Sequence, residues 1–272
     1  MSSDGNDAAF VGSIPEFYDQ YMVPLIFEPY AVDLARRAAD LHPKRVLEVA
    51  AGTGVVTRQM ATRLPADVPI VATDLNQAML THAAAQGTAR PVTWQQADAM
   101  QLPFPDQSFD LVVCEFGVMF FPDKAQAFAE ARRVLQPGGH FIFSVWDRID
   151  QNEFADVISY ALADMFPDDP PRFMERSPHG YHDVSVIARD LKRGGFTALP
   201  QMTTLGERSR AASPRIPAIA YCHGTVWRSE IEERGPGRLA EATDRSASAI
   251  AERFGTAAVN GKIQAHIVAI AR

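Results

Sequence analysis

The chain has 272 residues, of which 47% are hydrophobic, and its 26 basic and 33 acidic residues give a formal net charge of -7. This length and composition suffice for one large core, and no block of basic residues could follow a phosphate backbone, so nucleic acid is not an expected partner. The polar, acidic start and the lack of an apolar run of roughly 18 residues predict a cytoplasmic protein with no secretory signal and no membrane span. Cys114 and Cys222 lack metal-ligand spacing, which predicts free thiols and no metal site.

The first half of the chain alternates short β-rich runs with helical stretches, after a first segment (1–13) that we expect to be disordered. A helix is expected over Ile14 to Leu41. Strands are then expected at Arg45 to Val49, Ile70 to Thr73, Val92 to Gln95, Phe109 to Cys114 and Phe141 to Trp146, with helices at Thr57 to Leu64, Gln77 to Ala85 and Ala125 to Leu135. This alternation is typical of βαβ units, and it predicts an α/β fold with a doubly wound sheet.

The second half has a looser pattern, in which two more strands enclose a helical insertion. Helices are expected at Gln151 to Met165 and Asp183 to Arg193, with a proline-rich connection at Pro167 to Pro178 between them. The last two strands are expected at Thr197 to Leu205 and Ile263 to Ile270, and helical patterns at Pro217 to Glu232 and Gly237 to Phe254 lie between them. We expect one domain over 14–272, with the helical insertion at about 208–261 acting as a cap or lid over a substrate pocket.

The chemistry begins where the first strand, V-L-E-V, runs into the glycine turn A-A-G-T-G. In open α/β sheets, ligands bind outside the carboxyl ends of the strands. A dinucleotide site would have a third glycine three residues after Gly54, but Thr57 stands there. Glu48 would repel a pyrophosphate and attract an ammonium group, although it could instead be a solvated acid at a strand end.

Two further acids follow the next two strands. Asp74 lies 22 residues after Gly52, where a carboxylate takes the hydroxyls of a ribose, or it could cap the next helix unless Asn76 does so. Asp98 could accept from an adenine amine or only close a short turn. Ammonium, ribose and adenine in this order describe S-adenosylmethionine, and the adenine ring would then lie among Leu75, Met79 and Met100.

The chain resembles class I S-adenosylmethionine-dependent methyltransferases, in the branch of the ubiquinone and menaquinone biosynthesis C-methyltransferases. The motifs that carry the resemblance are V-L-E-V-A-A-G-T-G, A-T-D-L-N-Q-A-M-L, Q-A-D-A-M-Q-L-P-F-P-D-Q-S-F-D-L-V-V-C and A-R-R-V-L-Q-P-G-G-H-F-I-F-S-V-W-D. The resemblance implies a seven-stranded Rossmann-like sheet, mostly parallel with an antiparallel last strand, and helices at its N-terminal end.

The resemblance also assigns roles to residues. It places Glu48, Ala50, Gly52 and Gly54 at the methionine moiety, Asp74 at the ribose, Asp98 and Ala99 at the adenine, and Cys114 and Glu115 at the methyl-donor centre. It further suggests that Tyr18 and Tyr21, with Phe17 and Tyr30, close the donor pocket. The family usually has glycine at the position of Ala50, and a methyl group is tolerated there if φ is negative.

The sequence says much less about the methyl acceptor than about the methyl donor. We expect a small, partly apolar metabolite, methylated on oxygen or carbon by in-line displacement, with S-adenosyl-L-homocysteine as the other product. Glu115, His223 and His179 are the candidate bases, and each histidine could instead be a packing residue. The alternatives are a non-catalytic S-adenosylmethionine-binding or regulatory protein and an NAD-dependent dehydrogenase, and the sequence gives no oligomeric state.

Overall fold

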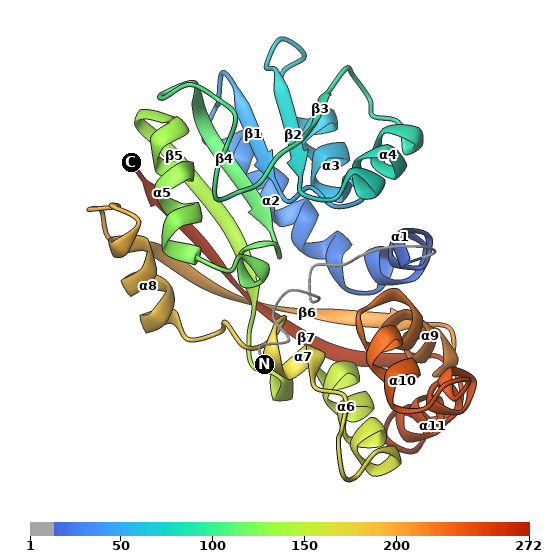
Figure 1. Cartoon of the computed structure of the whole chain (residues 1–272). Helices are drawn as coiled ribbons and strands as arrows, with labels where there is room; N and C mark the ends of the chain where they lie inside the picture. The colour runs from blue at the N-terminus through green and yellow to red at the C-terminus, as the bar shows by residue number, and fades with distance from the viewer. Residues whose placement is uncertain (1–13) are drawn as a thin grey trace. The chain divides into compact units, whose positions relative to one another are not determined.

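The computed structural model describes residues 14–272 and divides the chain into two compact units (Figure 1). The sheet unit comprises Glu28–Val145, Tyr181–Leu205 and Ala265–Arg272. Within the described residues, the helical unit comprises 14–27, Trp146–Gly180 and Gly206–Gln264. The expected disorder of residues 1–13 lies outside the described residues.

The sheet has seven strands in the order β3-β2-β1-β4-β5-β7-β6 (Figure 1). Their bounds are β1 Val46–Val49, β2 Ile70–Asp74, β3 Thr93–Gln96, β4 Phe109–Glu115, β5 Leu135–Trp146, β6 Gln201–Ala211 and β7 Val259–Ala271. The chain moves outward from β1 to β3 and then crosses back to β4, so the order reverses between β1 and β4, which is where α/β sheets bind ligands. The expected doubly wound sheet is confirmed.

The first five strands in this sheet run parallel and the last strand runs against its neighbours. The pairings of β1 with β2 and β4, of β2 with β3, and of β4 with β5 are all parallel. Beside β5, the amide of Arg272 donates to Gly139 and the amide of Asp147 donates to Gln264, so the residue numbers of β5 and β7 run in opposite directions. The antiparallel last strand is therefore confirmed.

Helices cover both faces of the sheet in the sheet unit. On one face, α2 (Glu28–Asp40) and α3 (Val55–Arg63) pack on alternate strand residues such as Val46, Leu111 and Val113. On the other face, Phe128 of α5 (Lys124–Val134) packs on Phe141 and Phe143 of β5, and α5 also contacts α8 (Val184–Arg193). The remaining elements of this unit are α4 (Gln77–Gln86) and the short 3-10 helix η3 (Val118–Phe120). Because strand side chains alternate between faces, Glu48 and Glu115 share the face that α2 and α3 cover.

The first expected helix is divided into three segments. These are α1 (Ile14–Phe17), a π-helical segment η2 (Tyr18–Phe27) and α2 (Glu28–Asp40), so a single α-helix over Ile14 to Leu41 was wrong in its middle ten residues. Pro24 lies inside η2 and has no amide proton to donate to the preceding turn, which favours a local change of helical register.

The helical unit contains the segments that the sequence predicts around and within the insertion. Its other helices are η4 (Ile149–Gln151), α6 (Glu153–Met165), α7 (Phe173–Arg176), α9 (Arg215–Gly224), α10 (Trp227–Arg234) and α11 (Leu239–Phe254). In this unit α11 packs on α6 and α9, and α9 packs on η2. The helical pattern at Pro217 to Glu232 forms two helices, because Thr225 is extended between them and its hydroxyl donates to the carbonyl of Tyr221.

Three strands have boundaries that differ from the expected ones. β7 begins at Val259, before the expected Ile263. β6 begins at Gln201, because Pro200 before it has no amide for a sheet ladder, and the strand then continues to Ala211. β5 begins at Leu135, and its register with β4 shifts between Phe109 and Leu111, near the left-handed Gly138. The intervening segment 212–258 therefore carries the three helices of the insertion.

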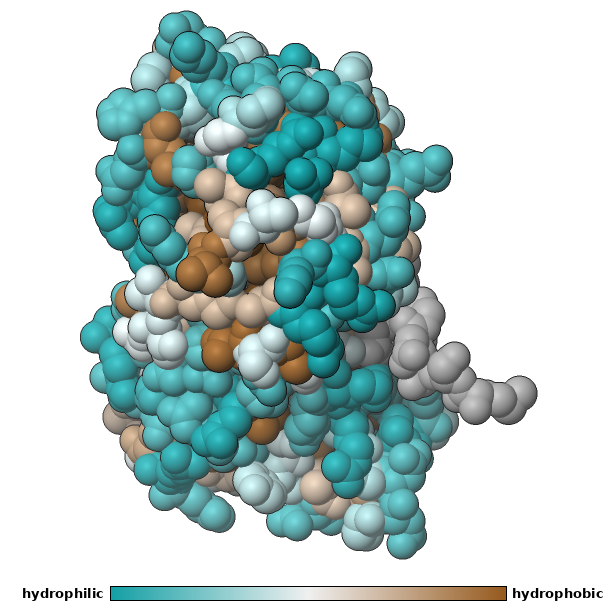
Figure 2. Space-filling model, turned by 90° about the vertical axis from the view of Figure 1, so that its left-hand side faces the viewer, coloured by the Kyte–Doolittle hydropathy of each residue, from teal (hydrophilic) through white to brown (hydrophobic). Residues whose placement is uncertain are grey.

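The surface drawn in Figure 2 is hydrophilic over most of its area, which fits a chain of net charge -7. Among the described residues, the large apolar side chains with the most exposure include Leu199, Tyr160 and Leu75. No helix in residues 14–272 combines the length and the apolar character that crossing a bilayer requires.

Candidate donor-binding site

The site starts with Glu48, which lies near the end of β1 with only 1% of its surface exposed. The hydroxyl of Thr57 in α3 donates to Glu48 Oε2 at 2.5 Å. Burial raises the pKa of Glu48 to about 8, and the Thr57 hydroxyl and the charge of Arg58 oppose this rise. Glu48 is therefore a sequestered acid on the sheet and not a solvated acid at a strand end.

Thr57 has a role that the sequence analysis missed. In the sequence, Thr57 only marks a departure from the dinucleotide pattern, yet its side chain is fully buried and donates a hydrogen bond to Glu48. A glycine at this position could not make this hydrogen bond. A hydroxyl residue nine positions after a strand-end acid, on the first turns of the next helix, is the signal that could have revealed the pair.

The turn after β1 is left-handed at three alternate positions. The φ angles of Ala50, Gly52 and Gly54 are 55°, 56° and 82°. Glycine adopts these angles freely, but alanine does not, so Ala50 does not meet the condition of a negative φ under which a methyl group is tolerated at this position. The strained Ala50 therefore lies at the carboxyl end of β1, two residues after Glu48.

The strained alanine faces a glycine that follows β4. A Cβ atom built on Gly117 would lie 2.5 Å from the Cβ atom of Ala50 and 2.8 Å from Sγ of Cys114. The methyl group of Ala50 thus occupies the space that a side chain at Gly117 would need. The residue before this glycine, Phe116, also has a positive φ of 49°, so backbone strain gathers at the ends of both central strands.

The two glycines of the turn do different work. No atom lies within 4 Å of a Cβ built on Gly52, so the backbone is open to a ligand there. A Cβ on Gly54 would lie 2.9 Å from the indole ring of Trp94, so this glycine permits close packing against β3. The first is suited to ligand approach, and the second to holding the turn on the sheet.

Asp74 at the end of β2 supports the same turn. Its Oδ2 accepts from the amide of Gly52 at 2.9 Å, and its Oδ1 accepts from the amide of Asn76 at 2.8 Å. Asn76 itself caps α4, because its side chain accepts from the amide of Ala78, so Asp74 is not the cap. Burial raises the pKa of Asp74, and the two backbone amides oppose this rise. Each carboxylate oxygen can accept a second hydrogen bond, which leaves room for ribose hydroxyls.

The candidate adenine residues differ in the surface that they offer. Leu75 is 58% exposed, Met100 is partly exposed, and Met79 is 4% exposed inside α4, so an adenine ring would find its apolar contacts on the first two. Asp98 Oδ1 accepts from the amide of Met100 at 2.8 Å and closes a short turn, beside the buried Ala99.

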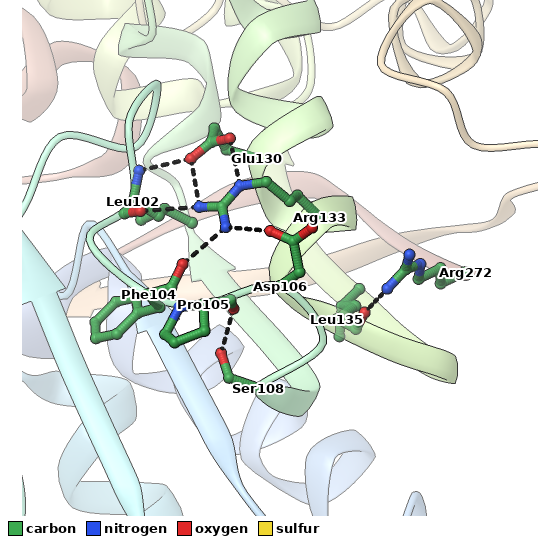
Figure 3. Close-up of polar contacts among 9 residues, drawn as sticks. All are labelled: Leu102, Phe104, Pro105, Asp106, Ser108, Glu130, Arg133, Leu135 and Arg272. Atoms are coloured by element: carbon green, nitrogen blue, oxygen red, sulfur yellow. Dashed lines mark hydrogen bonds and ion pairs between the residues drawn. The ribbon is translucent and has the colours of Figure 1, made fainter.

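The segment after this turn is fixed by Arg133 of α5 (Figure 3). The guanidinium donates to the carbonyls of Leu102 and Phe104 at 2.9 and 2.7 Å, and to both oxygens of Glu130 at 2.8 Å. Glu130 Oε2 also accepts from the amide of Leu102, and the neighbouring guanidinium lowers the pKa of Glu130. The sequence analysis missed this network, whose only local signal is the Glu130 and Arg133 spacing on one helix.

Cys114 and Glu115 end β4 and point to opposite faces of the sheet. Cys114 is fully buried, and burial raises the pKa of its thiol, so the thiol is neutral; its place at the methyl-donor centre stays a prediction. Glu115 lies on the face of Glu48, and its Oε1 atom is buried without a hydrogen-bond partner. Burial and the charge of Glu48 raise the pKa of Glu115 well above its ordinary value.

The other candidate residues belong to the helical unit. His223 Nε2 lies 3.0 Å from the hydroxyl of Thr243, which itself donates to Leu239, so Nε2 carries the proton and Nδ1 is the basic nitrogen. Burial and nearby arginines lower the pKa of His223. His179 is buried and its Nδ1 donates to the carbonyl of Asp147 at 2.7 Å.

The aromatic candidates of this unit are packed on one another. Tyr18 stacks on Phe27 with ring centroids 4.9 Å apart, and Tyr21 stacks on Phe17, which also stacks on His223. The roles of these residues and of the two histidines in donor binding or catalysis stay predictions. Within residues 14–272, no group of three or more histidine, cysteine or acidic side chains could hold a metal ion, and both cysteines are free.

Known proteins match the part of the chain that contains β1 to β4. Residues 47–143 match the family described as a methyltransferase domain. Demethylmenaquinone methyltransferase of Lactiplantibacillus plantarum is 31% identical over 168 residues, which cover 60% of this chain and 68% of the relative. The chain belongs to the class I S-adenosylmethionine-dependent methyltransferases.

Two other comparisons agree with this family. Demethylmenaquinone methyltransferase of Deinococcus radiodurans is 42% identical over 102 residues, covering 37% of this chain and 42% of the relative. A solved structure from Bacillus halodurans C-125 has a TM-score of 0.56 at 20% identity, and the match covers 88% of this chain and 97% of that one, which shows a shared fold. The chain spans 42%, 66% and 50% of the first three curated relatives that it matches.

Proposed function

We propose that the protein binds S-adenosylmethionine at the carboxyl ends of β1 to β4 and transfers its methyl group to a small-molecule acceptor. The observation that carries this proposal is the buried Glu48 behind a left-handed turn that the carboxylate of Asp74 supports. Two acids at the turn suit a ligand with a cationic end and a ribose, and they oppose a pyrophosphate. The family to which the chain belongs supports the same donor.

The residues present fit this donor on three counts. The hydroxyl of Thr53 in the turn is buried without a hydrogen-bond partner, so the site has a polar atom that a ligand could satisfy. The space over Gly52 is open to a ligand backbone or sugar. Leu75 and Met100 offer apolar surface after the ribose acid.

The donor would supply an activated methyl group on a sulfonium, which is an excellent leaving group. The protein's own task is then to hold donor and acceptor in line and to exclude water, which accounts for much of the rate in such displacements. Glu48 and Asp74 would fix the two ends of the donor. His223, through Nδ1, and His179 remain candidates for accepting a proton from the acceptor.

We propose that the acceptor is a small, partly apolar molecule and that the methyl group is transferred to a carbon or an oxygen atom. The names of the matched relatives make demethylmenaquinone the first compound to test. A cytoplasmic location, a single domain over 14–272 and a lid at about 208–261 likewise stay predictions. Limited proteolysis with and without S-adenosylhomocysteine tests the lid, because a lid that closes on the donor should be protected when the product binds.

Calorimetry against S-adenosylmethionine and NADH tests the donor. We expect binding of the first alone, and NADH binding without S-adenosylmethionine binding would overturn the proposal. In Asp74→Asn the donor affinity should fall by about 1.5 to 3 kcal/mol, the value for a hydrogen bond to a charged group. Transfer of a labelled methyl group to demethylmenaquinone and to a metabolite extract tests catalysis, and donor binding without any labelled product would favour a binding or regulatory protein.

A further inference from the structure

The ends of β1 and β4 place two acids side by side on one face of the sheet. Glu48 pairs in register with Val113, and Glu115 lies two residues further along the same strand, so its side chain emerges on the face of Glu48. Both acids lie in the sheet unit, under α2 and α3. Buried like charges at this spacing cannot both ionise without a large cost.

The surroundings of the two acids are unequal. Glu48 accepts the hydroxyl of Thr57, and its charge is favoured by Arg58 of α3 and opposed by Asp74 of β2. Glu115 faces the charge of Glu48. The residue before Glu115 is Cys114, whose buried thiol is neutral. The residue after it, Phe116, lies against the ring of Tyr30 of α2, whose hydroxyl donates to the carbonyl of Leu205. Glu48 is therefore the acid of the pair that can carry a negative charge.

The buried, unpartnered Oε1 atom of Glu115 determines whether this side chain is ionised or neutral. Oε1 is buried and has no hydrogen-bond partner, while the residue as a whole keeps some exposed surface. An ionised carboxylate would leave half of its charge on that sealed oxygen without a donor, which is expensive. A neutral acid leaves only a carbonyl there and carries its proton on the other oxygen, from which it can donate to a ligand.

We propose that Glu115 acts as a neutral carboxylic acid that donates a hydrogen bond to the bound donor, and that Glu48 is the one carboxylate of the pair and ionises when the donor's ammonium binds. This inference rests on the proposed function. It assigns Glu115 to donor binding and removes it from the candidates for the general base. The proton that Glu48 loses passes to solvent, so donor binding releases about one proton at neutral pH.

The substitution that tests this role is Glu115→Gln, because an amide reproduces a neutral acid that both donates and accepts. We expect Glu115→Gln to bind S-adenosylmethionine within about threefold of the wild-type affinity and to retain methyl transfer. Glu115→Leu, of similar size without polar atoms, should bind at least about tenfold more weakly. Asp40→Asn, an exposed acid at the end of α2, is the matched control and should bind as the wild type does.

Proton counting gives a second readout that folding defects do not imitate. Calorimetry of donor binding at pH 7 in phosphate and in Tris reports the protons released. The wild type and Glu115→Gln should each release about one proton, and Glu48→Gln should release none. For the wild type and Glu115→Gln, the donor affinity should rise with pH by up to about tenfold per unit below about pH 8. It should stop rising near that pH, where Glu48 is ionised before the donor binds and the donor's amino group begins to lose its own proton.

The outcomes separate this inference from the proposed function. If the wild type does not bind S-adenosylmethionine, the proposed function fails. If the wild type binds but Glu115→Gln loses affinity tenfold or loses proton release, Glu115 acts as a carboxylate and the inference is overturned. Wild-type affinity in Glu115→Leu also overturns it, because Glu115 would then make no hydrogen bond to the donor. If Glu115→Leu does not fold, the comparison of Glu115→Gln with the wild type still decides.

Discussion

Substituting Ala50 by glycine should stabilise the protein, although it removes a methyl group from a partly buried position. With φ at 55°, Ala50 has the left-handed backbone, which costs an L-residue about 1 to 2 kcal/mol. Glycine has no such cost, but its greater freedom in the unfolded chain takes back about 0.4 to 1 kcal/mol. The loss of the partly buried methyl group takes back about 0.4 kcal/mol more, half of the value for a fully buried one. The net result is a gain of about 0.2 to 0.6 kcal/mol in the free energy of unfolding for Ala50→Gly.

The neighbouring Ala51 provides the control, because it is 6% exposed and does not have a positive φ. Ala51→Gly loses a buried methyl group and gains chain freedom, so it should destabilise the protein by about 1.5 kcal/mol. Urea unfolding followed by circular dichroism measures both variants, and the two midpoints should move in opposite directions at similar slopes. If Ala50→Gly loses as much stability as Ala51→Gly, the strain attributed to Ala50 is absent and the reasoning is refuted.

Two other predictions concern charged groups. Burial raises the pKa of Glu48 from 4.5 to about 8, so the folded state binds this proton more tightly than the unfolded state does. The contribution of Glu48 to the free energy of unfolding is therefore complete below about pH 4.5. It is lost as the pH rises to about 8. The free energy of unfolding without ligand should therefore fall across this range, and it should fall less steeply in Glu48→Gln; equal slopes would contradict the assignment. Arg133→Lys keeps the charge but loses the forked contacts to Glu130, Leu102 and Phe104, so it should cost about 2 kcal/mol in urea unfolding and weaken donor affinity. A stability loss below about 0.5 kcal/mol would show that the segment at 102–106 is held by other contacts.

The sheet could be predicted because its signals are local. Each strand of the central sheet is a short apolar run bounded by turn residues, and the glycine turn after β1 identifies the end of the sheet that binds ligands. The alternatives for Asp74 were also local, and Asn76 proved to be the cap of α4. The proposal of a donor site at these strand ends rests on the same local signals, namely the order of acids after successive strands.

The features that were missed depend on residues far apart in the chain. The methyl group of Ala50 has space because residue 117, which follows β4, is a glycine. No sequence pattern connects Gly117 with the turn after β1. The Arg133 network joins a helix to carbonyls of an irregular segment, and carbonyl positions leave no trace in side-chain periodicity. The π-helical register around Pro24 likewise depends on which backbone hydrogen bonds form, and not on residue type alone.

The contact between Ala50 and Gly117 constrains how this sequence can change over evolutionary time. A Cβ at position 117 would lie 2.5 Å from the Cβ of Ala50, so the two positions have room for one side chain between them. Substitutions at these positions are then not independent. A lineage with alanine at position 50 must keep glycine at position 117. In a lineage that first acquires glycine at position 50, a side chain at position 117 would clash only with Sγ of Cys114, which would have to shift. The order in which the two mutations arise therefore decides whether the second is tolerated, and the pair should covary among related sequences.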